Sequence, residues 1–231
     1  GSVTITDSDA VTLKSNGGSF GNLVVNDFEG VALDDAETTS LTVEAGSDYT
    51  SLATADITGT EGVTSITLEA SGAESDIEVD AIADATNLST LSITGSGLNS
   101  QIELGIVGNE ASTTDAILSS LTVTASNGAD IDFAGTTDAE LGDVNTSEDM
   151  DTFKMSASGA GSTITAGELF ADGLTVTSVE LEASAGGVID METVSDVQAI
   201  NYAYESLILQ ATGTGSTLSI DSVAQDAGSL A

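Results

Sequence analysis

One short motif recurs along the whole chain. Its clearest copy is Leu88–Gly97, which reads LSTLSITGSG: an apolar residue, two small polar residues, and then apolar and polar residues in strict alternation up to a glycine. Alternation of this kind is typical of a β-strand with one buried face. Further copies place their first apolar strand residue at Leu41, Ile66, Leu121, Phe153, Val179 and Leu207, with weaker copies at Val3–Ile5 and Leu23–Val25. The chain is therefore a repeat protein.

A second, shorter alternating run follows each copy after a turn that contains glycine. In the regular part of the chain these runs are Asp76–Asp80, Gln101–Leu104, Asp130–Phe133, Thr163–Ala166, Val188–Met191 and Leu218–Asp221. Near the start of the chain, the predicted second strands are Val11–Leu13, Val31–Leu33 and Ala55–Ile57. One repeat thus consists of a strand, a glycine turn, a second strand and a loop of variable length.

The spacing of the repeats predicts how they pack. They lie about 20 residues apart near the start and 25 to 32 apart later, inside the range that indicates solenoids. A single repeat of this size cannot enclose a core, so copies bury their apolar side chains by stacking on one another. We therefore predict an all-β fold, a parallel β-solenoid of about eight to nine coils. A β-sandwich is the alternative, but it gives no reason for one motif to recur in one order.

The prediction divides the chain and aligns its core. Residues 1–231 form a single solenoid domain, with irregular shorter coils over 1–40, regular coils over 41–221 and a C-terminal tail over 222–231. Stacking should align one inward column of Leu41, Ile66, Leu91, Leu121, Phe153, Val179 and Leu207. A second column should hold Val43, Leu68, Ile93, Val123, Met155, Leu181 and Leu209, and a corner of small residues should run from Ala45 to Ala211.

Charge and composition exclude several functions. Two lysines face 38 carboxylates, for a net charge of −36, so nucleic acid and anionic membrane surfaces are not expected partners. The chain has no His and no Cys, which removes Ser–His and Cys–His nucleophile pairs. Only 3% of residues are aromatic, too few for the stacking platforms of a sugar-cleaving cleft. We expect no enzyme activity, and no apolar run is long enough to predict membrane insertion.

The second strands bring carboxylates into rows. If their apolar residues stack in register, Asp76, Gln101 and Asp130 form one outward row, and Glu78, Glu103 and Asp132 form the row beside it. Like charges opposite each other on adjacent strands are destabilising, and Ca²⁺ with its six to eight oxygen ligands would relieve the repulsion. The predicted calcium ligands are Asp76, Glu78, Glu103, Asp130, Asp132 and Asp149. Further acidic clusters are formed by the loop residues Asp138, Glu140, Asp143, Glu148, Asp149 and Asp151, and by Asp34, Asp35 and Glu37.

The repeats also suggest a family. Leu88–Gly95 and Leu118–Ala125, in a chain poor in Lys and without Cys, resemble the β-solenoid regions of secreted bacterial and archaeal surface-layer proteins and of extracellular filament or adhesin proteins. The resemblance implies a secreted or cell-surface structural subunit that self-assembles into a filament or lattice, with Ca²⁺ bridging its acidic faces. The glycine- and aspartate-rich calcium nonapeptide of many such proteins is absent from this chain.

Solenoid ends are relevant to assembly as well. The last coil at each end has open strand edges and must be capped or paired, and no amphipathic cap is evident at the start, where Val3–Ile5 begins a coil at once. We therefore expect end-to-end association with other copies of the chain, together with divalent cations. The alternative function is an adhesin stalk or a glycan-binding module of a larger secreted protein, which would remain a monomeric rod.

Overall fold

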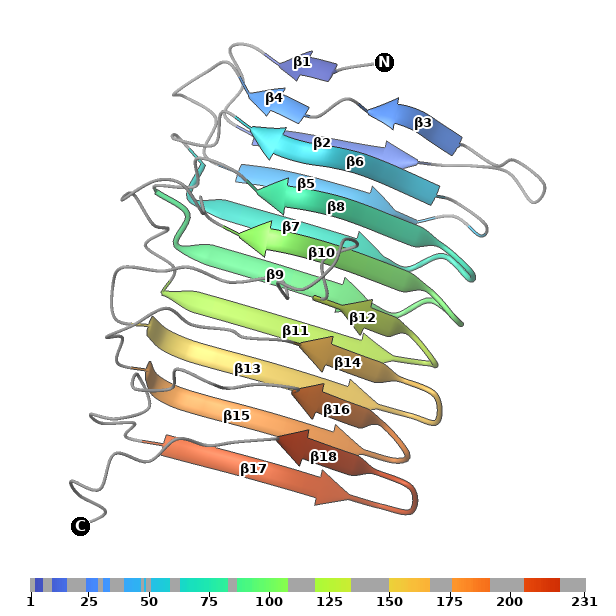
Figure 1. Cartoon of the computed structure of the whole chain (residues 1–231), viewed down its shortest axis with the longest axis vertical. Coiled ribbons are helices and arrows are strands. Elements are labelled where there is room, and N and C mark those ends of the chain that lie inside the picture. The colour runs from blue at the N-terminus through green and yellow to red at the C-terminus, as the bar shows by residue number, and fades with distance from the viewer. Residues whose placement is uncertain are drawn as a thin grey trace.

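The structure is a stack of β-strands in two parallel sheets (Figure 1). The computed structural model describes residues 3–5, 10–15, 24–28, 31–33, 40–46, 48, 51–58, 63–82, 87–107, 119–133, 150–166, 176–191 and 206–220. These residues contain strands and turns but no helix. Every strand pairing among them is parallel and joins a strand to its counterpart in a neighbouring repeat. The predicted β-solenoid is therefore confirmed, and the sandwich alternative is not adopted.

We call the ten-stranded sheet A and the eight-stranded sheet B. Sheet A contains β1 (Val3–Ile5), β3 (Val24–Phe28), β4 (Val31–Leu33), β6 (Ser51–Thr58), β8 (Asp76–Ile82), β10 (Gln101–Val107), β12 (Asp130–Asp132), β14 (Thr163–Ala166), β16 (Val188–Met191) and β18 (Thr217–Ile220). Sheet B contains β2 (Ala10–Ser15), β5 (Ser40–Ala45), β7 (Ser65–Ala70), β9 (Thr90–Gly95), β11 (Ser120–Ser126), β13 (Met150–Ser158), β15 (Val176–Ser184) and β17 (Ser206–Thr212).

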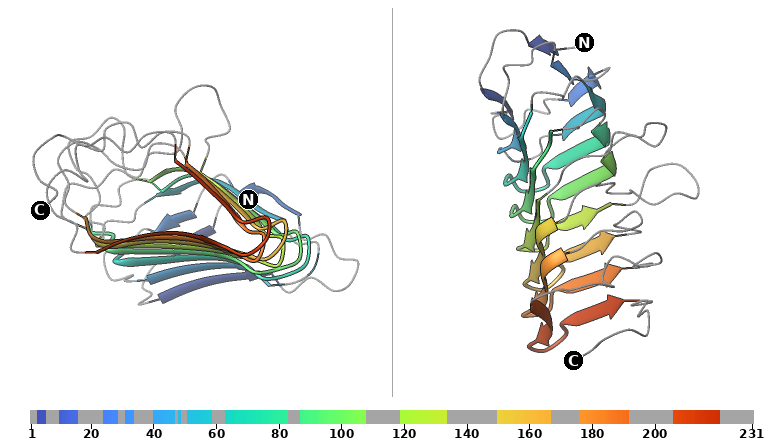
Figure 2. Two further views of the ribbon diagram at one scale, coloured as in Figure 1. Left: turned by 90° about the horizontal axis from the view of Figure 1, so that it is seen from below. Right: turned by 90° about the vertical axis from the view of Figure 1, so that its left-hand side faces the viewer.

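Each repeat contributes one rung, which we define as a strand of sheet B, its turn and the following strand of sheet A. In each of the six rungs from β7–β8 to β17–β18, both strands and the turn between them are described, whereas the loops that join successive rungs lie mostly outside the described residues. Viewed along the stack, the two sheets meet at the turns and diverge away from them, so that a rung has the outline of a wedge (Figure 2). The apolar side chains fill the space between the sheets.

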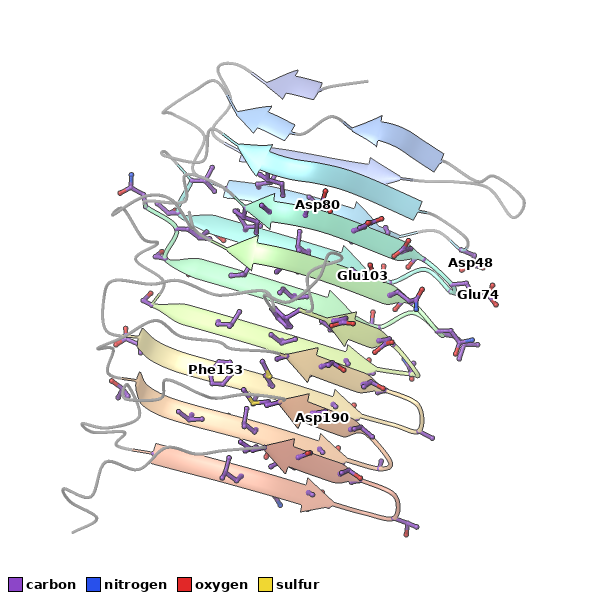
Figure 3. All side chains as sticks on the ribbon, viewed as in Figure 1. Asp48, Glu74, Asp80, Glu103, Phe153 and Asp190 are labelled. Carbon is purple, nitrogen blue, oxygen red and sulfur yellow. The ribbon has the colours of Figure 1, made fainter. Side chains whose placement is uncertain are left out.

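The core columns follow the predicted register. Leu91 pairs with Ile66 on one side and Leu121 on the other, and the column continues through Phe153 and Val179. Leu91 and Ile93 are fully buried, and Phe153, labelled in Figure 3, is only 2% exposed. A shift of one residue would turn every apolar side chain of a strand to the outer face, which is why the alternation fixes the register so firmly.

The turns between the sheets need close backbone approach and left-handed residues. In the β9–β10 turn, Gly97 donates its N–H to the carbonyl of Ala70 at 3.2 Å, and a Cβ at Gly97 would overlap the carbonyl oxygen of Gly72. The β11–β12 turn is shorter and places Asn127 and Gly128 at φ 59° and 82°. Asn and Gly adopt this region at lower steric cost than other residues, so the motif's glycine turns have a direct conformational basis.

The first coils differ from the prediction. The run Val3–Ile5 was expected in the main-strand column, but β1 lies in sheet A and pairs with β4. The run Val11–Leu13 was expected as a second strand, but β2 lies in sheet B and pairs with β5. The weak copy ending at Val25 overlaps β3, which also lies in sheet A, beside β6. Alternation shows which side chains are buried but does not identify the sheet that a short strand joins, so these assignments were wrong. The predicted tail 222–231 lies outside the described residues.

Candidate functional site

The outer face of sheet A carries the predicted carboxylate rows. Gln101 pairs with Asp76 on β8 and with Asp130 on β12, and Glu103 lies between Glu78 and Asp132 on the same strands. The predicted alignment of these residues is therefore observed. Figure 3 shows Glu103 on β10, projecting from this face.

The rows are confined to the middle of the sheet. On β14, the positions that follow Asp130 and Asp132 are Thr163 and Thr165. On β6, the position beside Glu78 is Ala53. The dense acidic patch, which we define as Asp76, Glu78, Glu103, Asp130 and Asp132, therefore spans three adjacent strands.

Two carboxyls of the acidic patch, those of Glu103 and Asp130, have a raised pKa. Partial burial of the Glu103 carboxyl raises its pKa above the ordinary value of 4.5, and the charges of Asp76 and Glu78 raise it further. Burial likewise raises the pKa of Asp130 above 3.8, with a further contribution from Asp132. The charged forms repel one another because the strands hold them side by side.

Metal ligation within one chain finds no geometric support in this patch. Among the described residues, no group of three or more acidic side chains is arranged to hold a metal ion. Of the predicted ligands, Asp149 lies outside the described residues, as do Asp138 and the cluster at Asp34. Asp151 lies on β13, and its side chain is exposed. Calcium binding thus stays a prediction.

The outer face of sheet B has a different chemistry. Both lysines of the chain lie on this sheet, each in register with a glutamate of the next rung: Lys14 with Glu44, and Lys154 with Glu180. The Lys154 Nζ lies 3.0 Å from a carboxylate oxygen of Glu180. Between these two pairs, β7 carries the outward carboxylate Glu69, whereas the outward positions of β9 and β11 hold the uncharged Ser92, Thr94, Thr122 and Thr124.

The rung β17–β18 stands apart from the others, and the sequence analysis did not single it out. Residues 206–220 contain no charged side chain, whereas each of the other five unbroken rungs carries at least one carboxylate. Leu209 belongs to the inward column yet is 45% exposed, while its neighbour Leu181 is 2% exposed. Ile208 is 41% exposed on the outer face, at a position that Glu180 and Lys154 occupy in the preceding rungs.

The lack of charge in residues 206–220 could be read from the sequence, where this uncharged stretch lies between Glu205 and Asp221. The exposure of Leu209 could not be predicted from the sequence. It arises because β17 pairs only with β15 among the described strands, so that one edge of the rung has no neighbour in that part of the chain.

At the opposite end of the stack the strands are also close to neutral. Strands β1 to β4 together carry one lysine, Lys14, and one aspartate, Asp27, so their net charge is 1 − 1 = 0. Strand β2 is the last described strand of sheet B on this side, and β3 lies beside β6 in sheet A. The charge of the described strands is therefore concentrated in the middle of the stack and is absent or balanced at its two ends.

Within the described residues no helix has the length and apolarity needed to cross a membrane. Comparison with protein-family models, with curated proteins and with solved structures finds no match to this chain. The likeness that the structure supports is therefore that of architecture, a parallel β-solenoid.

Proposed function

We propose that this protein is an extracellular structural subunit whose copies assemble end to end into a filament or surface lattice. The observation that carries the proposal is the rung β17–β18, which leaves Leu209 45% exposed in a segment without charge. Fully charged rungs would repel each other in a chain of net charge −36, whereas a neutral apolar rung can dock. The role is structural rather than catalytic.

The second element of the proposal concerns the acidic faces. A single copy brings no three acidic side chains of the described residues into a metal-binding arrangement. Two copies side by side would bring a second set of carboxylates to the acidic patch, and Ca²⁺ accepts many oxygen ligands in flexible geometry. Divalent cations would then act between copies, bridging faces that otherwise repel.

The proposal is tested by sedimentation and electron microscopy of the purified chain over a range of concentrations, with Ca²⁺ and with EDTA. We expect elongated assemblies that grow with concentration and that are longer or laterally associated when Ca²⁺ is present. Strictly monomeric rods under all conditions would overturn the proposal and would favour the stalk or glycan-binding module.

A matched pair of variants distinguishes a specific end-to-end contact from non-specific hydrophobic association. Leu209→Asp places a carboxylate at the open edge and should abolish assembly. Leu98→Asp alters a leucine that is 61% exposed in the β9–β10 turn, away from either end, and should assemble normally. Circular dichroism of both variants verifies that the fold is retained.

A further inference from the structure

The two ends of the stack belong to one continuous set of columns. The column that contains Lys14 on β2 continues through Glu44, Glu69, Thr94, Thr124, Ser156 and Glu182 to Gln210 on β17. By the same pairings, Leu13 shares a column with Leu209, and Thr12 shares one with Ile208. The strands at both ends run parallel to each other because every pairing between them is parallel.

From this register we infer that the partner of the β17 edge is the β2 edge of a second copy, in a head-to-tail contact that continues sheet B with Gln210 beside Lys14. The inference rests on the proposed end-to-end assembly and specifies its partner surface and its register. A head-to-tail contact of this kind is open and adds copies without limit, as a filament requires.

Burial of apolar side chains favours this register over registers that are shifted by one residue. Stacking in this register places Leu209 in the column that contains Leu13, and a neighbouring strand on this edge covers the side chain that is now 45% exposed. A slip of one residue would move Leu209 out of the column to which it belongs, so the pleat of the sheet excludes it. On the sheet A side the same stacking sets Leu218 in the column of Val25 on β3.

Charge points to the same pair of ends. The β17–β18 rung is uncharged and strands β1 to β4 have a net charge of zero, so head-to-tail stacking brings no like charges of these described strands opposite each other. Lys14 has Glu44 as its neighbour in register on β5, and the proposed contact sets the neutral Gln210 on its other side. Two β17–β18 rungs facing each other would bury apolar surface too, but their strands would not continue one parallel ladder.

Charge substitutions at Gln210 distinguish the proposed contact with Lys14 from general repulsion between two acidic copies. The two effects change the strength of association in opposite directions. If Gln210 lies beside Lys14, Gln210→Glu should strengthen association by roughly threefold and Gln210→Lys should weaken it by a similar factor. Repulsion between bodies of charge −36 predicts the reverse order. Ser156→Glu and Ser156→Lys are the matched controls, because Ser156 lies in the same column but in the middle of the sheet. They change the net charge by the same amount and therefore measure the effect of general charge repulsion on association.

Cross-linking measures the register directly, since the chain has no cysteine of its own. Single variants Gln210→Cys and Lys14→Cys, mixed under mild oxidation, should give mainly the heterodimer, because strands about 4.8 Å apart bring paired residues within disulfide range. Thr12→Cys, two residues away along β2, should cross-link poorly to Gln210→Cys, since the diagonal separation of about 8 Å exceeds that range.

The outcomes separate the two proposals. Assemblies that form without the Gln210–Lys14 heterodimer, or with mainly Gln210–Gln210 homodimers, would overturn the register while leaving end-to-end assembly intact. The absence of both assemblies and cross-links would overturn both. A heterodimer together with the Gln210→Glu gain is the expected result.

Discussion

The Nζ of Lys154 on β13 lies 3.0 Å from a carboxylate oxygen of Glu180 on β15, the residue with which it pairs in register. The side chain of Lys154 is 35% exposed and that of Glu180 is 27% exposed, so solvent weakens the pair but does not remove it. This ion pair gives one of the only two cations in the chain a defined place in the sheet.

Removal of this cation should lower stability in a salt-dependent way. We expect Lys154→Gln to reduce the free energy of unfolding by about 0.5 kcal/mol at low ionic strength. In about 1 M NaCl, where the screening length is about 3 Å, the difference from the parent chain should vanish. Urea unfolding at both salt concentrations measures it, and Thr122→Gln at the preceding position of the same column is the control. Equal destabilisation at both salt concentrations would contradict an electrostatic origin.

Two equivalent serines in successive turns should respond differently to truncation. Ser75 Oγ donates to the carbonyl of Gly72 at 2.7 Å, whereas the equally buried Ser100 Oγ has no hydrogen-bond partner among the described residues. Ser75→Ala should cost about 1 kcal/mol, while Ser100→Ala should be neutral or stabilising because it removes an unsatisfied hydroxyl. The next rung already has Ala129 at this position. Thermal unfolding compares the variants, and a large loss for Ser100→Ala would show that its hydroxyl has a partner.

The close backbone approach at Gly97 leaves no room for a side chain. Gly97→Ala would press its Cβ against the carbonyl oxygen of Gly72, and we expect a loss of about 1–3 kcal/mol. Ser96→Ala, one residue earlier in the same turn, should have little effect. Chemical unfolding provides the comparison; similar midpoints for the two variants would mean that the turn adjusts without strain.

Ala185 offers a site for stabilisation. It has φ 52° at the turn position that Asn127 occupies, with φ 59°, in the β11–β12 turn. Because the left-handed region costs an alanine roughly 1 kcal/mol, Ala185→Gly should raise the free energy of unfolding by about 0.5–1 kcal/mol. The control Ala160→Gly, at an alanine outside that region, should lower it. Destabilisation by both changes would argue against strain at Ala185.

The acidic patch predicts a gain of stability at mildly acidic pH. Because the pKa of Glu103 is raised above 4.5 in the folded chain, the folded state takes up a proton before the unfolded state as the pH falls. The free energy of unfolding should therefore rise as pH is lowered from neutrality through the raised pKa, with no further gain from this group below 4.5.

Glu103→Gln isolates this effect. It should stabilise the chain at neutral pH by about 0.2–1 kcal/mol, because Glu78 and Asp132 no longer face a third charge, and it should flatten the pH profile. Glu182→Gln is the matched control, since its neighbours in register are the uncharged Ser156 and Gln210. Urea midpoints between pH 7 and the acid limb give the comparison, and a parallel shift of both variants would show that net charge alone is responsible.

Much of the fold was predictable because each strand carries its own register. The alternation around Leu91 and Ile93 marks the buried face, and one-residue slips expose it, so the core columns and the carboxylate rows at Glu103 followed from the sequence alone. The glycine after each strand marked the turns for the same local reason.

What remained open depends on neighbours far away in the chain. The sheet that Val3–Ile5 joins is decided by the pairing of this strand with β4. The exposure of Leu209 depends on what lies on the far edge of β17, and no local pattern encodes that. The sequence by itself determined the repeating strand, its buried face and its charge, because these are properties of single residues and their immediate neighbours. Only the tertiary structure decided which strands meet, where the acidic patch stops and which edge is left open, because these depend on which strands lie next to each other.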